Sequence, residues 1–334
     1  MQNIQAILFN KIRTVAPNPG TLAEDLVKLL DISKDSAYRR LKGEKQLSFD
    51  ELVTVAQAYD LSLDDLLDLW EESIVFQGDY VSSDDFDLEK YLLSMLTNLQ
   101  KLEQFDQKEL FYISKDFPVF YYLMYPEVSA FKFFVWTKTQ MQFEAMKEKK
   151  FSFDTLTPRL AELALQVAEL YTRIPSSEIL NADNILNDLR QLEYYKDTNL
   201  MASHADLDII YSKLHEMTSH MEEQASSGRK FMPGKKASAA DASYKLYVND
   251  FFVGDNTIIA KAGDLRLVYV NHAAINFVYT STPAFVDYNE EFMNNIIKRS
   301  SLISEVGERT RSRFFNLIHE RIGHFSKGQS AGSY

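Results

Sequence analysis

The chain has 334 residues, of which 46% are hydrophobic and 25% charged, a composition typical of folded domains rather than of disordered chains. Its formal net charge of −12 excludes a polycation that coats nucleic acid without selectivity. The absence of cysteine excludes disulfides, thiolate metal ligands and cysteine nucleophiles, and it favours a cytoplasmic protein.

Neither the N-terminal apolar segment nor the aromatic segment 111–136 predicts insertion into a membrane. Residues 1–20 have the spacing of an amphipathic helix, and Lys11 and Arg13 stand on the wrong side of it for a signal peptide. Residues 111–136 contain eleven aromatic side chains, but charged residues and prolines interrupt them, so no stretch reaches the ~20 apolar residues of a membrane span. We expect this aromatic block to form the core of a domain. It could also line an apolar pocket or a dimer interface.

The first 72 residues predict five short helices, of which the second and third are joined by a tight turn. The second runs from about 21 to 30, and Asp31 follows it where the chain must turn, because Asp tolerates the left-handed conformation. Ser33 is a good N-cap for the third helix. The apolar residues expected to pack the second helix on the first are Leu26, Leu29 and Leu30 against Ile4, Leu8 and Ile12.

The third helix is short and basic. Ala37 and Leu41 are four residues apart and face inward, Tyr38 lies at the edge, and Gly43 ends the helix. Residues 33–46 carry five basic and two acidic side chains, so this stretch is locally positive inside an acidic protein. Such a helix is suited to the major groove of DNA, where base edges present a readable pattern of donors and acceptors.

Two more helices close this region. Ser48 and Glu51 have the spacing of a capping box, and a fifth helix is predicted from Ser62, with Asp65 in the matching position. The buried stripe of the fourth helix is expected to contain Leu52, Val55, Ala56 and Tyr59.

Three consecutive segments, LAEDLVKLLDIS, SKDSAYRRLKG and SFDELVTVAQAYDLSLDDLL, resemble the DNA-binding domain of the Xre family of regulators, which is shared with the Cro-type phage repressors. The resemblance covers about residues 4–69 and implies a five-helix Cro-like helix-turn-helix domain that binds double-stranded DNA. It implies that the residues nearest the base edges are Lys34, Asp35, Ser36 and Arg39, with Tyr38 beside them. Arg40, Lys42 and Lys45 are expected to contact phosphates.

The remaining chain predicts a larger α+β region. We expect a helical domain over 85–225, involved in dimerisation or sensing, and a small α+β part over 243–325. The boundaries are expected within 77–87 and 224–242, and residues 326–334 are expected to be a disordered tail. The fold class predicted for the whole chain is therefore mostly α with a small antiparallel sheet.

The small part begins with four predicted strands and ends with two helices. The strands are expected at 244–253, 256–262, 264–270 and 274–280, and the helices near 285–299 and 307–323. Gly263 lies between two of the strands and suits a hairpin turn.

No pattern in the C-terminal region predicts catalysis, a cofactor or a metal. Two H-E-x-x-x-H patterns start at His215 and His319, but histidines five apart are ~140° apart around a helix and do not share a face as zinc ligands require. The basic residues Arg229, Lys230, Lys235 and Lys236 are expected to keep a loop soluble, although they could contact DNA.

These observations predict a one-component transcriptional regulator that is not an enzyme. One short recognition helix reads few base pairs, so a homodimer is expected, and the C-terminal region could sense a small-molecule or peptide effector. Two alternatives remain open. The C-terminal region could be a ligand-binding protein or an enzyme with an accessory helix-turn-helix, or the basic helix could be a protein-interaction adaptor for an acidic partner.

Overall fold

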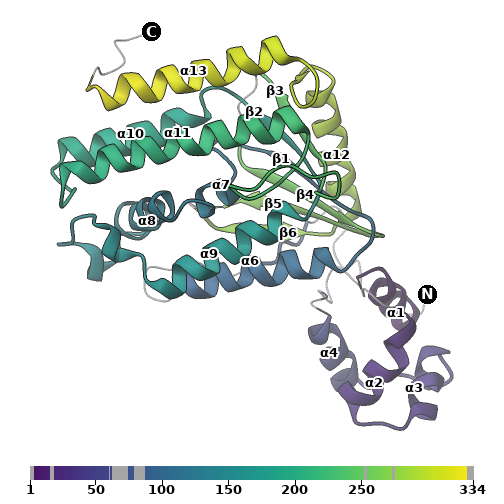
Figure 1. Ribbon diagram of the computed structural model, residues 1–334. Coiled ribbons are helices and arrows are strands. Elements are labelled where there is room, and N and C mark those ends of the chain that lie inside the picture. Colours follow the sequence, from purple (N-terminus) through teal and green to yellow (C-terminus); the bar gives the residue numbers. More distant parts are fainter. Residues whose placement is uncertain are drawn as a thin grey trace.

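The computed structural model describes residues 4–15, 19–59, 61, 74–78, 87–251, 254–272 and 275–328. Its N-terminal part contains helices that lie apart from the larger α+β region (Figure 1). The predicted fifth helix falls outside the described residues. The N-terminal elements are α1 (Ile4–Val15), the short turn η1 (Pro19–Thr21), α2 (Leu22–Leu30), α3 (Lys34–Leu41) and α4 (Phe49–Ala58).

The N-terminal helices share a small core of their own. Leu26 of α2 is fully buried against Leu8 and Ile12 of α1, as the helical spacing predicted, whereas Ile4 and Leu29, also expected in this contact, keep 45% and 36% of their area exposed. Ala37 of α3 is also fully buried. Each helix is too short to be stable alone, so this packing holds the small domain together.

Local capping explains where these helices begin and end. Asp31 has the left-handed conformation after α2, with φ of 49°. The hydroxyl of Ser33 accepts from the amide of Ser36 at 3.3 Å, and Ser48 and Glu51 form the predicted capping box at the start of α4. These side chains satisfy amide groups that have no partner inside a helix.

The larger region is built on one seven-stranded mixed sheet with the order β6-β5-β4-β1-β2-β3-β7. β2 pairs in parallel with β1 and β3, and the other neighbours are antiparallel. The strands are β1 (Lys108–Ile113), β2 (Ser176–Leu180), β3 (Tyr244–Val248), β4 (Thr257–Ala262), β5 (Leu265–Asn271), β6 (Phe277–Thr280) and β7 (Ser301–Leu302).

The predicted mostly helical fold with a C-terminal α+β region is confirmed. The four predicted strands are β3 to β6, and Gly263 forms the expected turn between β4 and β5, with φ of 56°. The sheet is larger than predicted because β1, β2 and β7 join it, which makes it mixed rather than antiparallel. Consequently, the expected division at 224–242 falls between strands of one sheet.

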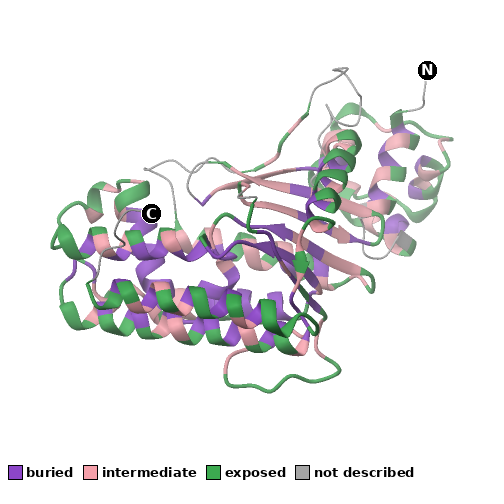
Figure 2. Cartoon of the chain, turned by 90° about the horizontal axis from the view of Figure 1, so that it is seen from above, coloured by how far each residue is buried: buried purple, intermediate pink, exposed green. Residues whose placement is uncertain are grey.

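Helices cover both faces of this sheet. The main core collects side chains from seven helices on one face, whereas Val286 and Met293 of α12 pack on the other (Figures 1 and 2). The helices of the first face are α6 (Leu88–Glu103), α7 (Val119–Leu123), α8 (Pro126–Val135), α9 (Pro158–Thr172), α10 (Asn184–Asp197), α11 (His204–Ser227) and α13 (Glu308–Ser326). α12 spans Pro283–Ile297, and the π-helix η2 (Trp136–Gln140) and the 3₁₀ helices η3 (Glu144–Met146) and η4 (Phe153–Thr155) complete the described elements.

The aromatic block 111–136 lies in the main core. Most of its side chains are buried, and Phe120 stacks on Tyr171 of α9 with ring centroids 4.0 Å apart. The interpretation of this block as a domain core is therefore confirmed. α13 extends to Ser326, the first residue of the predicted tail, and residues 329–334 lie outside the described part of the chain.

Lys230 corrects the expectation that the basic residues after α11 are simply solvated. Its side chain is 1% exposed, and its ammonium donates to the carbonyl of Ile174 at 3.0 Å and lies 3.1 Å from the centre of the Tyr171 ring. Glu178 of β2 lies in the same polar cluster and accepts hydrogen bonds from Tyr121 and Tyr244 at 3.2 and 3.1 Å. Burial lowers the pKa of Lys230 to about 7.

This buried lysine predicts a pH-dependent stability. An unfolded lysine keeps its proton up to about pH 10. Between pH 7 and 9 the unfolded state therefore binds more protons, and the free energy of unfolding should rise by up to about 1.4 kcal/mol per pH unit. Urea titrations across this range should show the rise in the natural chain and not in Lys230→Met. An equal slope in both proteins would contradict the prediction.

The two H-E-x-x-x-H patterns meet in the fold. His215 of α11 and His319 of α13 stack with their Nδ1 atoms 2.9 Å apart, and burial lowers the pKa of both imidazoles. No group of three or more potential metal ligands occurs among the described residues. Two neutral imidazoles can share one hydrogen bond, so this pair can join α11 to α13.

Candidate nucleic-acid interface

One face of α3 is buried in the domain, and the other face is exposed to solvent. Ala37 is fully buried against the N-terminal core, and Tyr38 at the edge keeps 46% of its surface exposed. The side chains that project into solvent from α3 and the loop after it are Lys34, Asp35, Tyr38, Arg39, Lys42, Glu44, Lys45 and Gln46. This arrangement is the one that a helix needs to enter a groove while the other face holds it in the domain.

Arg40 departs from its predicted role as a phosphate contact. Its side chain is 3% exposed, and its guanidinium makes a bidentate pair with Glu51 of α4, with Nη2–Oε1 and Nε–Oε2 distances of 2.6 and 3.1 Å. Nη1 also donates to the carbonyl and hydroxyl of Ser36. The structure therefore gives Arg40 a role inside the domain, because Glu51 and Ser36 occupy its donors, and this speaks against the predicted phosphate contact.

Glu51 binds both α3 and its own helix end. Its carboxylate accepts from Arg40 and from the amide of Ser48 at 3.0 Å. The hydrogen bond from Arg40 is the main cause that lowers the pKa of Glu51. The ion pair is therefore intact at neutral pH and fixes the angle at which α3 stands on α4.

Ser36 is less available than its neighbours. It is half-buried, and its hydroxyl oxygen accepts a hydrogen bond from Nη1 of Arg40 at 2.5 Å. Lys34, in contrast, is 63% exposed and makes only a loose pair with Glu24 at 3.6 Å. Surface pairs of this kind contribute little and are readily exchanged for a phosphate.

Gln5 is a positioning residue that the sequence did not indicate. It is 5% exposed, and its amide donates to the carbonyls of Arg40 and Lys45 at 2.6 and 2.9 Å. Its Oε1 accepts from the amide of Leu47 at 2.7 Å. One side chain of α1 thereby fixes the loop that carries Lys45. The sequence could not predict this role, because a glutamine in an amphipathic helix is usually exposed to solvent.

The described residues of α3 form a compact donor-rich surface. Arg39 has a free path to solvent and can pair with the O6 and N7 atoms of guanine, whereas Asp35 can only accept and suits the amino group of cytosine. Lys42 and Lys45 lie beyond the helix end, where ammonium groups suit phosphates. In the part of the chain that the structure describes, no helix has the length and apolar character to cross a bilayer.

A comparison with known protein families agrees with this geometry. Residues 13–80 match the family model of the BetR domain, an N-terminal DNA-binding domain of helix-turn-helix type. The match contains α2, α3 and α4. No curated protein and no solved structure matches the chain. The N-terminal helices thus match a DNA-binding domain of helix-turn-helix type, and the match ends before the α+β region.

Proposed function

We propose that the protein is a sequence-specific transcriptional regulator of the Xre type that acts in the cytoplasm and has no catalytic activity. The observation that carries the proposal is α3, whose serine cap and buried Ala37 fix a helix with Arg39 exposed to solvent. The match to the BetR domain supports DNA as the partner. The negative charge of the whole molecule favours selective contact through this basic surface.

We further propose that the protein binds its operator as a homodimer. α3 has eight residues, so one copy contacts only a few base pairs. Two copies related by a two-fold axis would read half-sites about one helical turn apart and gain both affinity and specificity. Sedimentation of the protein with a two-half-site duplex should give two chains per duplex, and one chain would contradict the dimer.

The DNA-binding proposal is tested with Arg39→Ala. A duplex is first selected from a random pool by the natural chain, and its affinity is measured by fluorescence anisotropy at several salt concentrations. Loss of one bidentate contact to guanine should weaken binding by about 1–3 kcal/mol and reduce discrimination at one base pair.

Arg13→Ala is the matched control, because Arg13 is an exposed arginine of α1 that donates to Asn10 at 2.8 Å. This variant should bind the selected duplex as the natural chain does. If the natural chain binds no duplex at low salt, the regulator proposal fails and the basic surface is better explained as an adaptor for an acidic protein.

A further inference from the structure

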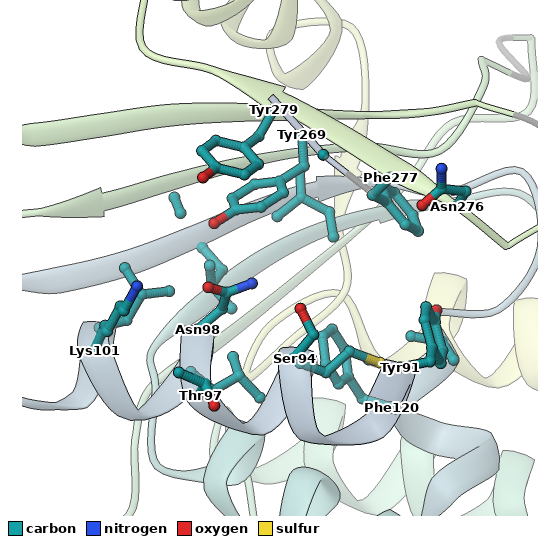
Figure 3. Close-up of a pocket in the computed structure, with 18 of the residues that line it drawn as sticks. Tyr91, Ser94, Thr97, Asn98, Lys101, Phe120, Tyr269, Asn276, Phe277 and Tyr279 are labelled. Atoms are coloured by element: carbon teal, nitrogen blue, oxygen red, sulfur yellow. The ribbon is translucent and has the colours of Figure 1, made fainter. Parts of the chain in front are cut away.

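A cleft of about 720 Å³ opens between α6 and the face of β4, β5 and β6 (Figure 3). α6 lines it from its N-cap Asp87 to Leu102, a length of roughly 20 Å at the rise of an α-helix. A volume of this size accommodates an organic molecule rather than a single ion. The cleft is separate from the α3 surface and is not used by DNA binding.

The floor of the cleft is apolar. Leu102, Leu110, Phe120 and Ala260 line it and are buried in the main core, and the part-buried Ile258 continues the same surface along β4. An occupant therefore needs an apolar body, since only such a body gains free energy from leaving water for this floor.

The walls of the cleft are rich in hydrogen-bond donors. Ser94, Asn98 and Lys101 line it from α6, at a spacing that places them on one face of the helix. The hydroxyls of Tyr269 and Tyr279 point from the sheet toward this face (Figure 3). Burial raises the pKa of Tyr269, so its phenol stays protonated and donates.

Among the described residues that line the cleft, basic side chains outnumber acidic ones, although the protein is strongly acidic. The charged residues in the described part of the lining are Lys90, Lys101 and Asp87. The Asp87 carboxylate already accepts from the amide of Glu89 at 2.8 Å as the cap of α6. The lining therefore favours an anion, whose oxygens would accept from lysine, amide and phenol groups.

The cleft also touches the chain that comes from the helix-turn-helix. We call residues 74–78 the connector. Gln77 pairs with Tyr279 of β6 through two backbone hydrogen bonds of 2.7 and 2.8 Å, and Gly78 lines the cleft. A Cβ on Gly78 would lie 3.1 Å from Cγ1 of Val278 and 3.2 Å from the carbonyl of Phe277. The connector is thus held tightly against the strand that forms one wall of the cleft.

We propose that this cleft binds an amphipathic organic anion, such as a carboxylate with a linear apolar chain, and that occupancy acts on the helix-turn-helix through the connector. That the cleft binds an anion is argued from the cleft alone. That an occupant changes DNA affinity rests on the proposed DNA binding. A ligand changes DNA affinity only if it binds the two arrangements of the connector unequally.

Binding is tested on the full chain with the fluorescent anion anilinonaphthalene sulfonate. Saturable enhancement is expected, with about tenfold weaker binding in Ser94→Trp, which fills the cleft from its exposed side, and in Lys101→Glu, which reverses the charge. Gln100→Trp and Lys298→Glu are the matched controls, because both residues are exposed and lie outside the cleft, and each should bind as the natural chain does.

Competition identifies the chemistry of the occupant. Decanoate should displace the probe at least about tenfold better than decanol or decyltrimethylammonium, because only decanoate combines the chain with a negative charge. Equal displacement by all three compounds, unchanged binding in Ser94→Trp, or no saturable enhancement would each overturn the site.

The coupling is tested with the selected duplex. Saturating decanoate should change the affinity of the natural chain for the duplex by at least about threefold, and it should have no effect on Lys101→Glu. Decanoate binding without any change in DNA affinity would refute the coupling and leave the site. A chain that binds no duplex would refute the proposed function, while the fluorescence titration would still report on the cleft.

Discussion

The Arg40→Ala variant is expected to lose both the stability of the N-terminal helices and the affinity for DNA. The guanidinium of Arg40 is buried in a bidentate pair with Glu51 and holds α3 on α4. Removing one partner of a buried pair costs about 3–5 kcal/mol, and the partial exposure of Glu51 places the loss near the lower value. Thermal unfolding followed by circular dichroism and anisotropy with the selected duplex measure the two effects.

A double variant distinguishes a loss of stability from the loss of a direct contact between Arg40 and DNA. Arg40→Met with Glu51→Gln removes both charges, and the glutamine can still accept from the amide of Ser48. Since well-packed neutral side chains often replace a buried ion pair without loss, we expect stability within about 1 kcal/mol of the natural chain and restored DNA binding. A folded double variant that binds as weakly as Arg39→Ala would show that Arg40 contacts DNA after all.

The Asp188→Ala variant is expected to destabilise the α+β region by about 3–5 kcal/mol. The side chains of Asp188 and Lys132 are 3% and 5% exposed, and their charged atoms are 2.7 Å apart. Asp188 also accepts from the hydroxyl of Tyr122 at 2.8 Å. The substitution leaves the buried Tyr122 phenol without its acceptor and the buried Lys132 ammonium without its counter-charge, with Gln191 as its remaining acceptor at 3.0 Å.

Denaturant unfolding followed by tryptophan fluorescence measures this effect, because Trp136 lies in the main core. A Trp70→Phe background removes the other tryptophan of the chain. The control is Lys132→Met with Asp188→Leu, which removes both charges and should recover most of the loss. If the single and double variants are equally unstable, the cost comes from packing rather than from the unpaired charge.

The sequence was most informative where structure is local. Asp31, Ser33 and Ser48 act through backbone groups no more than four residues away, so their residue types alone located the ends of α2, α3 and α4. The same applies to the turn at Gly263 between two alternating strands. Such signals need no knowledge of the rest of the chain.

The sheet was harder to predict because its centre does not have the usual strand pattern. β2 is fully buried, yet it contains Ser176, Ser177 and Glu178, which lack the apolar pattern of a buried strand and lie inside the segment predicted to be helical. Tyrosines from α7, α9 and β3 supply the missing hydrogen bonds to Glu178. These partners lie up to 66 residues away, so no local pattern could reveal the strand.

The candidate interface shows the same limit. Exposure of Arg39 follows from its place on an amphipathic helix, whereas burial of Arg40 depends on Glu51, eleven residues away. On a helical wheel Arg39 lies opposite Ala37, whereas Arg40 lies on the same side as Ala37, and the sequence does not show that Glu51 of α4 stands there to pair with it. The cleft beside α6 likewise needs strands that the sequence places far from that helix.

The backbone pairing of Gln77 with Tyr279 has a consequence for how the protein can be divided. β6 is the last strand at one edge of the sheet, and the connector covers the outward amide and carbonyl of Tyr279. A truncated chain that starts at residue 87 would leave this edge open and remove Phe76 from the ring of Phe285. An uncovered edge recruits strands from other molecules. The C-terminal region is therefore a safer independent fragment when it retains residues 74–78.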